Sequence, residues 1–334
     1  MATKWGILSA SKISHDFVVA LALLPSEDHK IVAVAAKDEA RAKLFANELK
    51  IPNHHGSYEA LASDPNVDIV YIGALNHQHY SLTKLMLANG KHVLCEKPFC
   101  INTKQLAELI ELAKSKRIFL MEAMWSRFGP AYEKVFEEIQ KGTLGNVLSV
   151  KANFCVPIAT QERIWKKEVG GGSVLDLGVY LLHLVNMVYG PEEPKSIVSD
   201  GVLNEHGVDL AFSAILKYSD GRLATISTDT RMAQDNSAYI YGDKGSIKIH
   251  QPFHASNKIT VNNSIDYVFE QPEPWKPNIY PNSVQLRYQA EHARQCLKKG
   301  LTESSVLDLN TSYRVQKLMD KIREQIGVQF DEDN

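Results

Sequence analysis

The chain has 334 residues, of which 44% are hydrophobic and 23% charged, as in a globular protein of about two domains. A formal net charge of −2 gives no electrostatic reason to expect a nucleic acid or an anionic membrane as partner. The four cysteines lack the spacing of metal or redox sites, and no run approaches the roughly 20 apolar residues of a membrane span. We therefore expect a cytoplasmic protein that binds no metal, nucleic acid or membrane.

The first 125 residues alternate short apolar runs with helical patterns. Strands are predicted at 5–8, 31–35, 69–72, 92–95 and 118–121, and helices over 39–49, 80–88 and 103–115. Ile13, Phe17 and Leu21 recur at helical spacing between the first two strands. Continuous apolar strands are typical of a parallel sheet covered on both faces, so residues 1–125 are predicted to form a doubly wound, nucleotide-binding Rossmann domain.

Residues 126–334 have a different hydrophobic pattern, which predicts a second domain of the α+β class. Segments with alternating polarity occur at 147–154, 196–202, 211–218, 222–230, 237–241 and 246–250, and turn signals such as 242–245 separate them. Helices are predicted at 130–141, 176–188 and 283–299, and the proline-rich stretch 271–281 is predicted to be a loop. The pattern indicates a mostly antiparallel sheet.

The first strand-to-helix turn is a candidate phosphate-binding loop. A Rossmann fingerprint would place glycine at Ser9 and Ser11, and glycine or alanine at Ser14, so the glycine pattern itself is absent. Small side chains still permit close backbone approach, and helix N-terminal amides still favour phosphate. This loop alone leaves two interpretations equally open, a cofactor site and an ordinary turn.

The end of the second strand favours NADP over NAD. Enzymes that use NAD place Asp or Glu there for the ribose 2′-hydroxyl. Here Lys37 follows the strand and Arg41 lies one turn later, where both would attract a 2′-phosphate. Asp38 is placed to cap the next helix instead. The alternative is that Lys37 and Arg41 are solvated surface charges.

Glu96-Lys97-Pro98 follows the apolar strand 92–95 and is the first candidate for chemistry. Open α/β sheets bind ligands beyond the carboxyl ends of their strands. A lysine there is partly removed from water and can share protons, and Glu96 can hold it in place. A lysine in a surface loop is the alternative, and it would be preferred for an isolated Lys-Pro pair.

A glycine run at 170–172 precedes the second candidate cluster and is expected to let the backbone pass close to another surface, for which the cofactor is a candidate. In a helix that starts near Ser173, Asp176 and Tyr180 are four residues apart and share a face, with His183 on the same stripe. Tyrosine, whose ordinary pKa is about 10, becomes a usable acid or base beside a lysine cation. The alternative makes Tyr180 a core residue and Asp176 a helix cap.

Aromatic residues where a crevice between the two domains is expected are candidates for a substrate wall. Trp125 and Arg127 follow the last Rossmann strand, and Phe154 and Tyr280 lie in or beside segments whose conformation the sequence does not fix. A structural cluster between domains is an equally good interpretation of Trp125. His77, His79 and His183 are too dispersed to predict a metal site.

Together these motifs resemble the glucose–fructose oxidoreductase and inositol dehydrogenase family, and most closely its dimeric dihydrodiol dehydrogenase branch, also described as NADP-dependent D-xylose dehydrogenase. The resemblance rests on residues 5–9, 76–79, 96–98, 122–125 and 171–180, in order and at matching spacing, and runs nearly end to end. It implies that the second domain has an open sheet that serves as a homodimer interface. It also implies that Lys97, Tyr180 and Asp176 are catalytic. The expected substrate contacts are Asp176 together with the wall candidates Trp125, Arg127, Phe154 and Tyr280.

The motifs and the resemblance together give a set of expected cofactor contacts. These residues are Ser9, Ala10, Ser11, Lys12, Ile13, Lys37, Arg41, Tyr71, Leu75, Asn76, His79, Glu96 and Lys97. The predicted function is hydride transfer between a sugar or trans-dihydrodiol hydroxyl and NADP. Two alternatives remain, an NADPH-dependent reductase of a sugar-derived carbonyl and a non-catalytic NADP-binding regulatory protein.

Overall fold

The computed structural model describes residues 2–334, which form two compact units. The first unit comprises the chain up to residue 100, residues 105–128 and residues 271–309; the second comprises 101–104, 129–270 and 310–334. A single boundary at residue 125 therefore does not describe the compact units. The reason is that the later segment 271–309 returns to the first unit, where helix α9 (Leu286–Lys298) packs on α1 (Lys12–Leu21).

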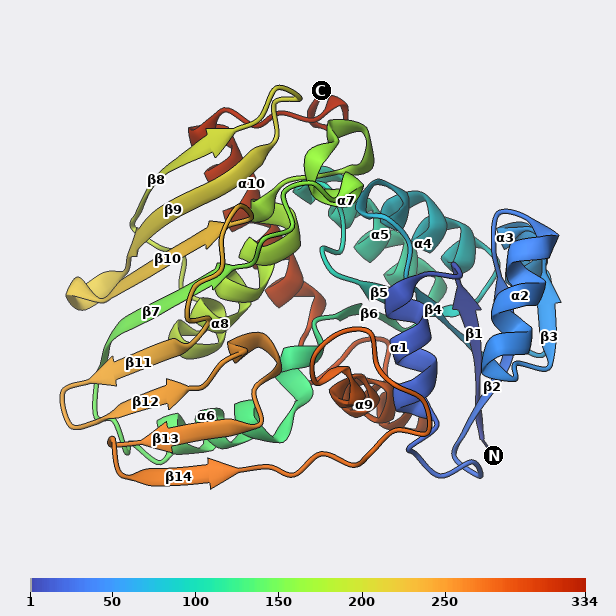
Figure 1. Ribbon diagram of the computed structural model, residues 1–334, viewed down its shortest axis with the longest axis horizontal. Helices are drawn as coiled ribbons and strands as arrows, with labels where there is room; N and C mark the ends of the chain where they lie inside the picture. The colour runs from blue at the N-terminus through green and yellow to red at the C-terminus, as the bar shows by residue number, and fades with distance from the viewer. Residues whose placement is uncertain (1) are drawn as a thin grey trace. The chain divides into compact units, whose positions relative to one another are not determined.

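The first unit contains a parallel six-stranded sheet in the order β3-β2-β1-β4-β5-β6 (Figure 1). Its strands are β1 (Thr3–Leu8), β2 (His29–Ala35), β3 (Asn53–His55), β4 (Ile69–Ile72), β5 (His92–Glu96) and β6 (Leu120–Ala123). The strand order reverses between β1 and β4, which is the switch point at which doubly wound sheets bind ligands. The loops after β1, β4 and β5 therefore carry the candidate site of this unit.

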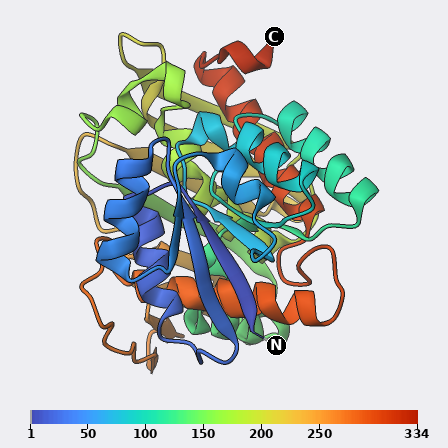
Figure 2. The same ribbon diagram turned by 90° about the vertical axis from the view of Figure 1, so that its right-hand side faces the viewer.

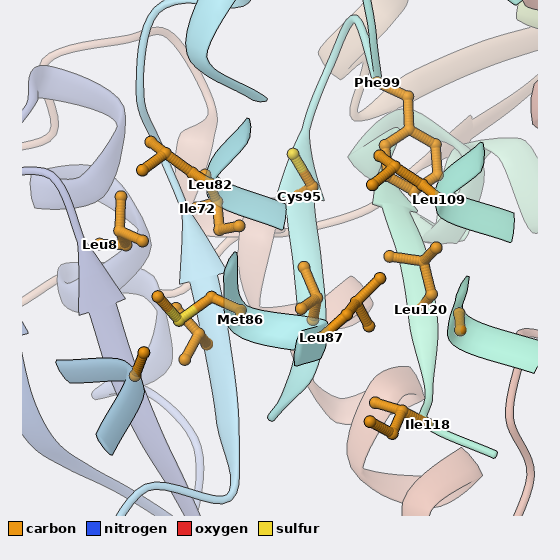
Figure 3. Packing of buried hydrophobic residues seen from close by; sticks show 14 of the residues in the cluster. Leu8, Ile72, Leu82, Met86, Leu87, Cys95, Phe99, Leu109, Ile118 and Leu120 are labelled. Carbon is orange, nitrogen blue, oxygen red and sulfur yellow. The ribbon is translucent and has the colours of Figure 1, made fainter. Parts of the chain in front are cut away.

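Helices lie on both sides of this sheet (Figure 2). They are α1, α2 (Glu39–Leu49), α3 (Tyr58–Ser63), α4 (His79–Ala88), α5 (Thr103–Lys116) and α9. Figure 3 shows part of the resulting core, where Ile72 and Cys95 of the sheet lie near Leu82 and Leu87 of α4, and Leu120 lies near Leu109 of α5. Each buried leucine or isoleucine contributes about 1.5–3 kcal/mol, so this core stabilises the strands that carry the loops of the candidate site.

The second unit contains an eight-stranded sheet in the order β14-β13-β12-β11-β7-β10-β9-β8. The strands are β7 (Val147–Cys155), β8 (Ser196–Leu203), β9 (Asp209–Lys217), β10 (Leu223–Asp229), β11 (Ala238–Gly242), β12 (Ser246–Ile249), β13 (Lys258–Val261) and β14 (Ile265–Val268). Only β7 and β10 pair in parallel; the other pairs are antiparallel. The predicted fold class, a Rossmann domain with a mostly antiparallel α+β domain, is confirmed.

Helices α6 (Pro130–Gln140), α8 (Val179–Tyr189) and α10 (Leu309–Ile326) accompany this sheet (Figure 1). The other face of the sheet carries exposed side chains: Val198 of β8 is the direct cross-strand neighbour of Ile215 of β9, and they are 68% and 49% exposed. Tyr241 and Leu223 on the same face are also exposed. One face of the second unit's sheet is thus open and partly apolar.

A helical stretch, Lys167–Tyr189, includes α8 and is the one segment among residues 2–334 that is long and apolar enough to cross a membrane. Its apolar window is 94% buried inside the protein, as in the core helix of a globular domain. A helix that is buried on all sides in a protein core is apolar all round, so this burial accounts for the apolar composition of Lys167–Tyr189.

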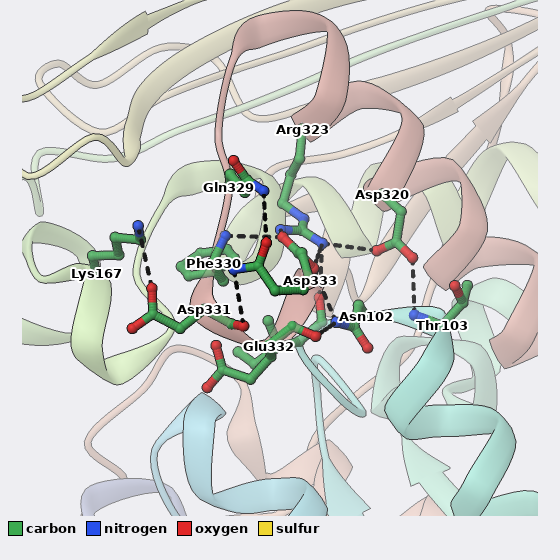
Figure 4. A network of polar contacts seen from close by, with 12 residues as sticks. Asn102, Thr103, Lys167, Asp320, Arg323, Gln329, Phe330, Asp331, Glu332 and Asp333 are labelled. Carbon is green, nitrogen blue, oxygen red and sulfur yellow. Dashed lines mark hydrogen bonds and ion pairs between the residues drawn. The ribbon is translucent and has the colours of Figure 1, made fainter.

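The last turns of α10 and the residues that follow it hold the short segment 101–104 in the second unit (Figure 4). Asn102 Nδ2 donates to Asp333 Oδ1 at 2.9 Å, and Arg323 Nη1 donates to Asp333 Oδ2 at 2.9 Å. The backbone N–H of Thr103 donates to Asp320 Oδ2 at 2.9 Å. These contacts explain why residues 101–104 belong to the second unit, although the residues before and after them belong to the first.

Candidate functional site

The turn after β1 has the geometry of a cofactor loop although it has no glycine. Ser9 adopts a φ of 84°, in the left-handed region that usually favours glycine. Ser11 is the N-cap of α1, and its side chain accepts from the backbone N–H of Ser14 at 3.2 Å. The remaining amides at the start of α1 form the type of N-terminus that favours phosphate. Ala10, Lys12 and Ile13 complete this turn.

Gly73, directly after β4, allows the loop to pack against α1. A Cβ at this position would lie 2.4 Å from Ser14 Oγ and 3.2 Å from Ser11 Oγ. In the Rossmann fingerprint a glycine at the start of the helix serves this close helix–strand approach. Here the glycine stands on the neighbouring strand instead, a substitution that a search for the glycine pattern misses.

Two cations and one carboxylate, Lys37, Arg41 and Asp38, follow β2 at this end of the sheet. Asp38 is the N-cap of α2, and its Oδ1 accepts from the backbone N–H of Arg41 at 2.8 Å. Arg41 Nη2 donates to the carbonyl oxygen of Ala10 at 3.1 Å, which holds the guanidinium at the turn. Lys37, two residues after the end of β2, is exposed. A nicotinamide dinucleotide with a 2′-phosphate fits this set, since a cation faces the loop and the carboxylate is engaged elsewhere.

Glu96 ends β5 as a buried carboxyl group with 3% exposure. Tyr71 Oη donates to Glu96 Oε1 at 2.7 Å, and the Tyr71 ring stacks on Phe17 with a centroid distance of 3.7 Å. Burial raises the pKa of Glu96 to about 7, although the bond from Tyr71 and the charge of Lys97 oppose this. Tyr71 and Glu96 have almost no exposed surface, so they support Lys97 from inside the unit.

Lys97 is partly buried and is joined to Pro98 by a cis peptide bond. His79, at the start of α4, places a ring nitrogen 2.7 Å from the carbonyl oxygen of Pro98 and the other 3.1 Å from that of Ala74. Burial lowers the pKa of His79 to about 4, so its neutral ring donates to one of these carbonyls. His79 thereby links the loops after β4 and β5. Of the two other expected cofactor contacts in the loop after β4, Leu75 is exposed and Asn76 is partly exposed.

The substrate candidates of the first unit lie on two segments. Trp125 and Arg127 belong to a 3₁₀ turn, Trp125–Phe128, in which Trp125 is 3% exposed. Tyr280 lies in the loop after β14, and its backbone N–H donates to Asp16 Oδ2 of α1 at 2.8 Å. That loop is therefore fixed to the helix that begins at the cofactor turn.

Asp176 and Tyr180 belong to the second unit, on one continuous helical segment. Asp176 lies in a π-helical turn, Val174–Gly178, and Tyr180 is the second residue of α8. Asp176 forms an ion pair with Arg163 of α7 (Glu162–Trp165). π turns occur frequently at functional sites, and this one replaces the regular helix that the sequence predicts.

The glycine run before this helix packs against protein atoms. A Cβ on Gly171 would lie 2.5 Å from the carbonyl oxygen of Lys166, and one on Gly172 would lie 2.3 Å from Asp209 Oδ1. Gly172 also has a φ of 109°, which side chains rarely adopt. The sequence predicts a close approach at these glycines, but it does not identify the partners.

Phe154 and Tyr180 form part of an aromatic cluster in the second unit. Their ring centroids are 5.7 Å apart, and the His254 ring lies 4.4 Å from Phe154 and 5.1 Å from Tyr180. Neither Arg163 nor His254 is identified by sequence reasoning, because each is separated from Tyr180 in the chain and belongs to no motif. Among residues 2–334, no group of three or more His, Cys, Asp or Glu side chains is placed to hold a metal ion.

Comparison with known proteins identifies the family. Residues 4–124 match the oxidoreductase family with an NAD-binding Rossmann fold, and residues 132–248 match the GFO/IDH/MocA C-terminal domain. Over 330 residues the chain is 44% identical to trans-1,2-dihydrobenzene-1,2-diol dehydrogenase of Xenopus tropicalis, covering 99% of this chain and 100% of the relative. The chain belongs to the GFO/IDH/MocA oxidoreductase family. The predicted family and enzyme class are confirmed.

A further relative and two solved structures also resemble this chain. The trans-1,2-dihydrobenzene-1,2-diol dehydrogenase of Danio rerio is 40% identical over 334 residues, covering 100% of both chains. Among solved structures, a levoglucosan dehydrogenase in complex with NADH and levoglucosan has a TM-score of 0.85 at 17% identity, covering 97% of each chain. The 3-ketoreductase KijD10 from Actinomadura kijaniata, in complex with NADP, has a TM-score of 0.83 at 22% identity, covering 98% of each chain. These two structures share the fold of this chain.

Proposed function

We propose that the protein is an NADP-dependent dehydrogenase that oxidises a hydroxyl group of a sugar or of a trans-dihydrodiol. The observation that carries this proposal is full-length similarity, at 44% identity, to a trans-1,2-dihydrobenzene-1,2-diol dehydrogenase. The sugar alternative, of which D-xylose is the example, is supported by the levoglucosan bound to a structural neighbour. Both substrate classes present vicinal hydroxyl groups to the enzyme.

The preference for NADP rests on Arg41. Its guanidinium is bound to the carbonyl oxygen of Ala10 in the cofactor turn, and exposed Lys37 ends the same strand-to-helix connection. A guanidinium pairs with a phosphate in a bidentate, charge-assisted manner, whereas a ribose hydroxyl offers it no charge. NAD is therefore the weaker cofactor in this proposal.

The reaction requires a proton acceptor at the substrate hydroxyl and a hydride acceptor at its carbon. A bound nicotinamide supplies the hydride acceptor. In the proposal, Tyr180 accepts the hydroxyl proton, and Lys97 stabilises the resulting tyrosinate and orients the hydroxyl group. Asp176, fixed by its ion pair with Arg163, positions the neighbouring hydroxyl.

The remaining predicted residues would set substrate shape. Trp125, Arg127 and Tyr280 are assigned to the substrate wall on the first unit, and Phe154 on the second. The ring of Phe154 supports this role because it packs edge-on against Tyr180 at 5.7 Å. The same residues would serve the reverse direction, reduction of a sugar-derived carbonyl with NADPH.

The proposed working form is a homodimer in the cytoplasm. The open face of the second unit's sheet supports a dimer, because Val198, Ile215, Leu223 and Tyr241 expose apolar surface there. Exposed apolar surface of this kind marks protein interfaces. The four cysteines are all buried, which is compatible with a reducing compartment.

A substrate panel tests the proposed function. Purified protein is supplied with NADP or NAD and with D-xylose, D-glucose, levoglucosan or a trans-dihydrodiol, and nicotinamide reduction is followed by absorbance. We expect turnover with NADP to exceed that with NAD, with one substrate class clearly preferred. NADPH binding without turnover in either direction, on any member of the panel, would favour the regulatory alternative.

A further inference from the structure

Asp209 is a buried carboxylate that faces the beginning of the helix bearing Asp176 and Tyr180. It is the first residue of β9 and is 1% exposed. Its Oδ2 accepts from the backbone N–H of Val174 at 2.7 Å and from Ser173 Oγ at 2.6 Å. Ser173, the helix's own N-cap residue, makes no side-chain cap bond. A residue 35 positions later in the chain therefore caps this helix.

A short chain of hydroxyl groups continues from Asp209 to the sheet. Ser173 Oγ lies 2.6 Å from Thr228 Oγ1 of β10, and Thr228 is 2% exposed. Ser173 has one hydroxyl proton, which it donates to Asp209. Thr228 must therefore be the donor in the bond between Thr228 and Ser173. Two neighbouring strands thus define where the helix begins.

The charge of Asp209 suits this place. Burial raises its pKa to about 6, while the bonds from Ser173 and Val174 oppose the rise, so the carboxylate is mostly ionised at neutral pH. An anion at a helix N-terminus interacts favourably with the amides that lack an intrahelical partner and with the helix dipole. The crowded position of Gly172, whose Cβ would lie 2.3 Å from Asp209 Oδ1, shows how closely the chain passes this group.

The π turn makes the cap important for chemistry. Val174, which Asp209 binds, is the first residue of that turn; Asp176 lies two residues later, and Tyr180 follows directly in α8. A π turn is rare and is held by its surroundings rather than by intrinsic preference. If its first residue moves, the side chains of Asp176 and Tyr180 rotate with it.

We propose that Asp209, acting through Ser173 and Val174, is a positioning residue that fixes the orientation of Tyr180 and Asp176 toward the substrate. This inference rests on the proposed function of Tyr180. Asp209 does not touch substrate; it sets the angle at which the reacting groups are presented. Small errors in such an angle reduce the reaction rate without abolishing binding.

A double-mutant cycle tests this role. Asp209→Asn removes the charge but keeps the size and one acceptor oxygen, and we expect it to lower kcat about 10- to 100-fold, with the KM for NADP unchanged. In a Tyr180→Phe background the same substitution should lower kcat by a clearly smaller factor than in the wild type, because Tyr180, one of the two groups that it orients, is already absent. Equal fold-losses in both backgrounds would overturn the proposal and leave Asp209 a structural residue.

A second test compares variants of two neighbouring threonines, Thr228 and Thr230. It remains informative even if the Asp209 variants do not fold. Thr228→Val removes the hydroxyl that supports Ser173, whereas Thr230→Val removes an equally buried hydroxyl that donates to the carbonyl oxygen of Leu210 at 2.8 Å. We expect similar losses of Tm but a lower kcat only for Thr228→Val. Equal kcat values for the two variants would contradict the proposal.

The cycle also separates this inference from the proposed function. Absence of turnover in the wild type, or unchanged kcat in Tyr180→Phe, would refute the proposed function itself. Wild-type turnover with a strong Tyr180→Phe effect, but additive losses on changing Asp209, would refute only the positioning role.

Discussion

Burial of Glu96 beneath Lys97 predicts a specific pH dependence of stability. Its pKa is raised from 4.5 to about 7 in the folded protein, chiefly by burial. One pKa unit corresponds to about 1.36 kcal/mol, so the shift corresponds to about 3 kcal/mol of unfolding free energy. For a raised carboxyl pKa this stability is present in full below pH 4.5 and is lost as the pH rises through about 7.

The variant Glu96→Gln should remove this dependence, because the amide cannot ionise and still offers an oxygen to Tyr71 Oη. Unfolding by urea at a series of pH values from about 5 to 8 gives the free energy for each protein. We expect the variant to gain about 2–3 kcal/mol relative to the wild type across this range. A difference that stays constant with pH would refute the assignment of this carboxyl group.

Tyr71→Phe serves as the matched variant. The bond from Tyr71 Oη lowers the pKa of Glu96, so its removal should shift the loss of stability to higher pH. The pH dependence should therefore persist in Tyr71→Phe and disappear in Glu96→Gln.

Other predictions concern cofactor choice, packing and assembly. Arg41→Ala should raise the KM for NADP at least about tenfold and leave that for NAD nearly unchanged, whereas Lys43→Ala, exposed on the same helix, should affect neither in steady-state kinetics. Gly73→Ala should destabilise the protein by about 1–3 kcal/mol in chemical denaturation and weaken NADP binding, because its Cβ would overlap Ser14 Oγ. Ile215→Lys should convert a dimer to a monomer in light scattering; Leu44→Lys, at a residue 70% exposed on the first unit, should not.

The alternation of strands and helices in the Rossmann domain was predictable because its buried parallel strands are continuous apolar runs. Other elements were not found for different reasons. β3, with the sequence Asn-His-His, has no apolar residue. In α10, the apolar residues Val315, Leu318 and Ile322 recur at helical spacing, a signal that the sequence carries but that its many charges obscure. Strands β13 and β14 are only four residues long, too short for a clear alternation.

The candidate site was predictable as separate motifs and not as a geometry. Lys97, Asp176 and Tyr180 stand out because each motif joins reactive side chains to a strand end or a helix start. The π turn was not predictable, since no local pattern distinguishes it from a regular helix. The bond from Val174 to Asp209 joins residues that only the tertiary fold brings together, and the Arg163–Asp176 pair likewise depends on how α7 folds back.

The most direct test of the central claim compares nicotinamide reduction by the wild type, Lys97→Met and Tyr180→Phe on the preferred substrate with saturating NADP. We expect measurable wild-type turnover and a kcat lowered by about two to four orders of magnitude in each variant, the range of general acid–base catalysis. NADP binding should be nearly unchanged in Tyr180→Phe. Near-normal turnover in both variants would contradict the catalytic roles of Lys97 and Tyr180.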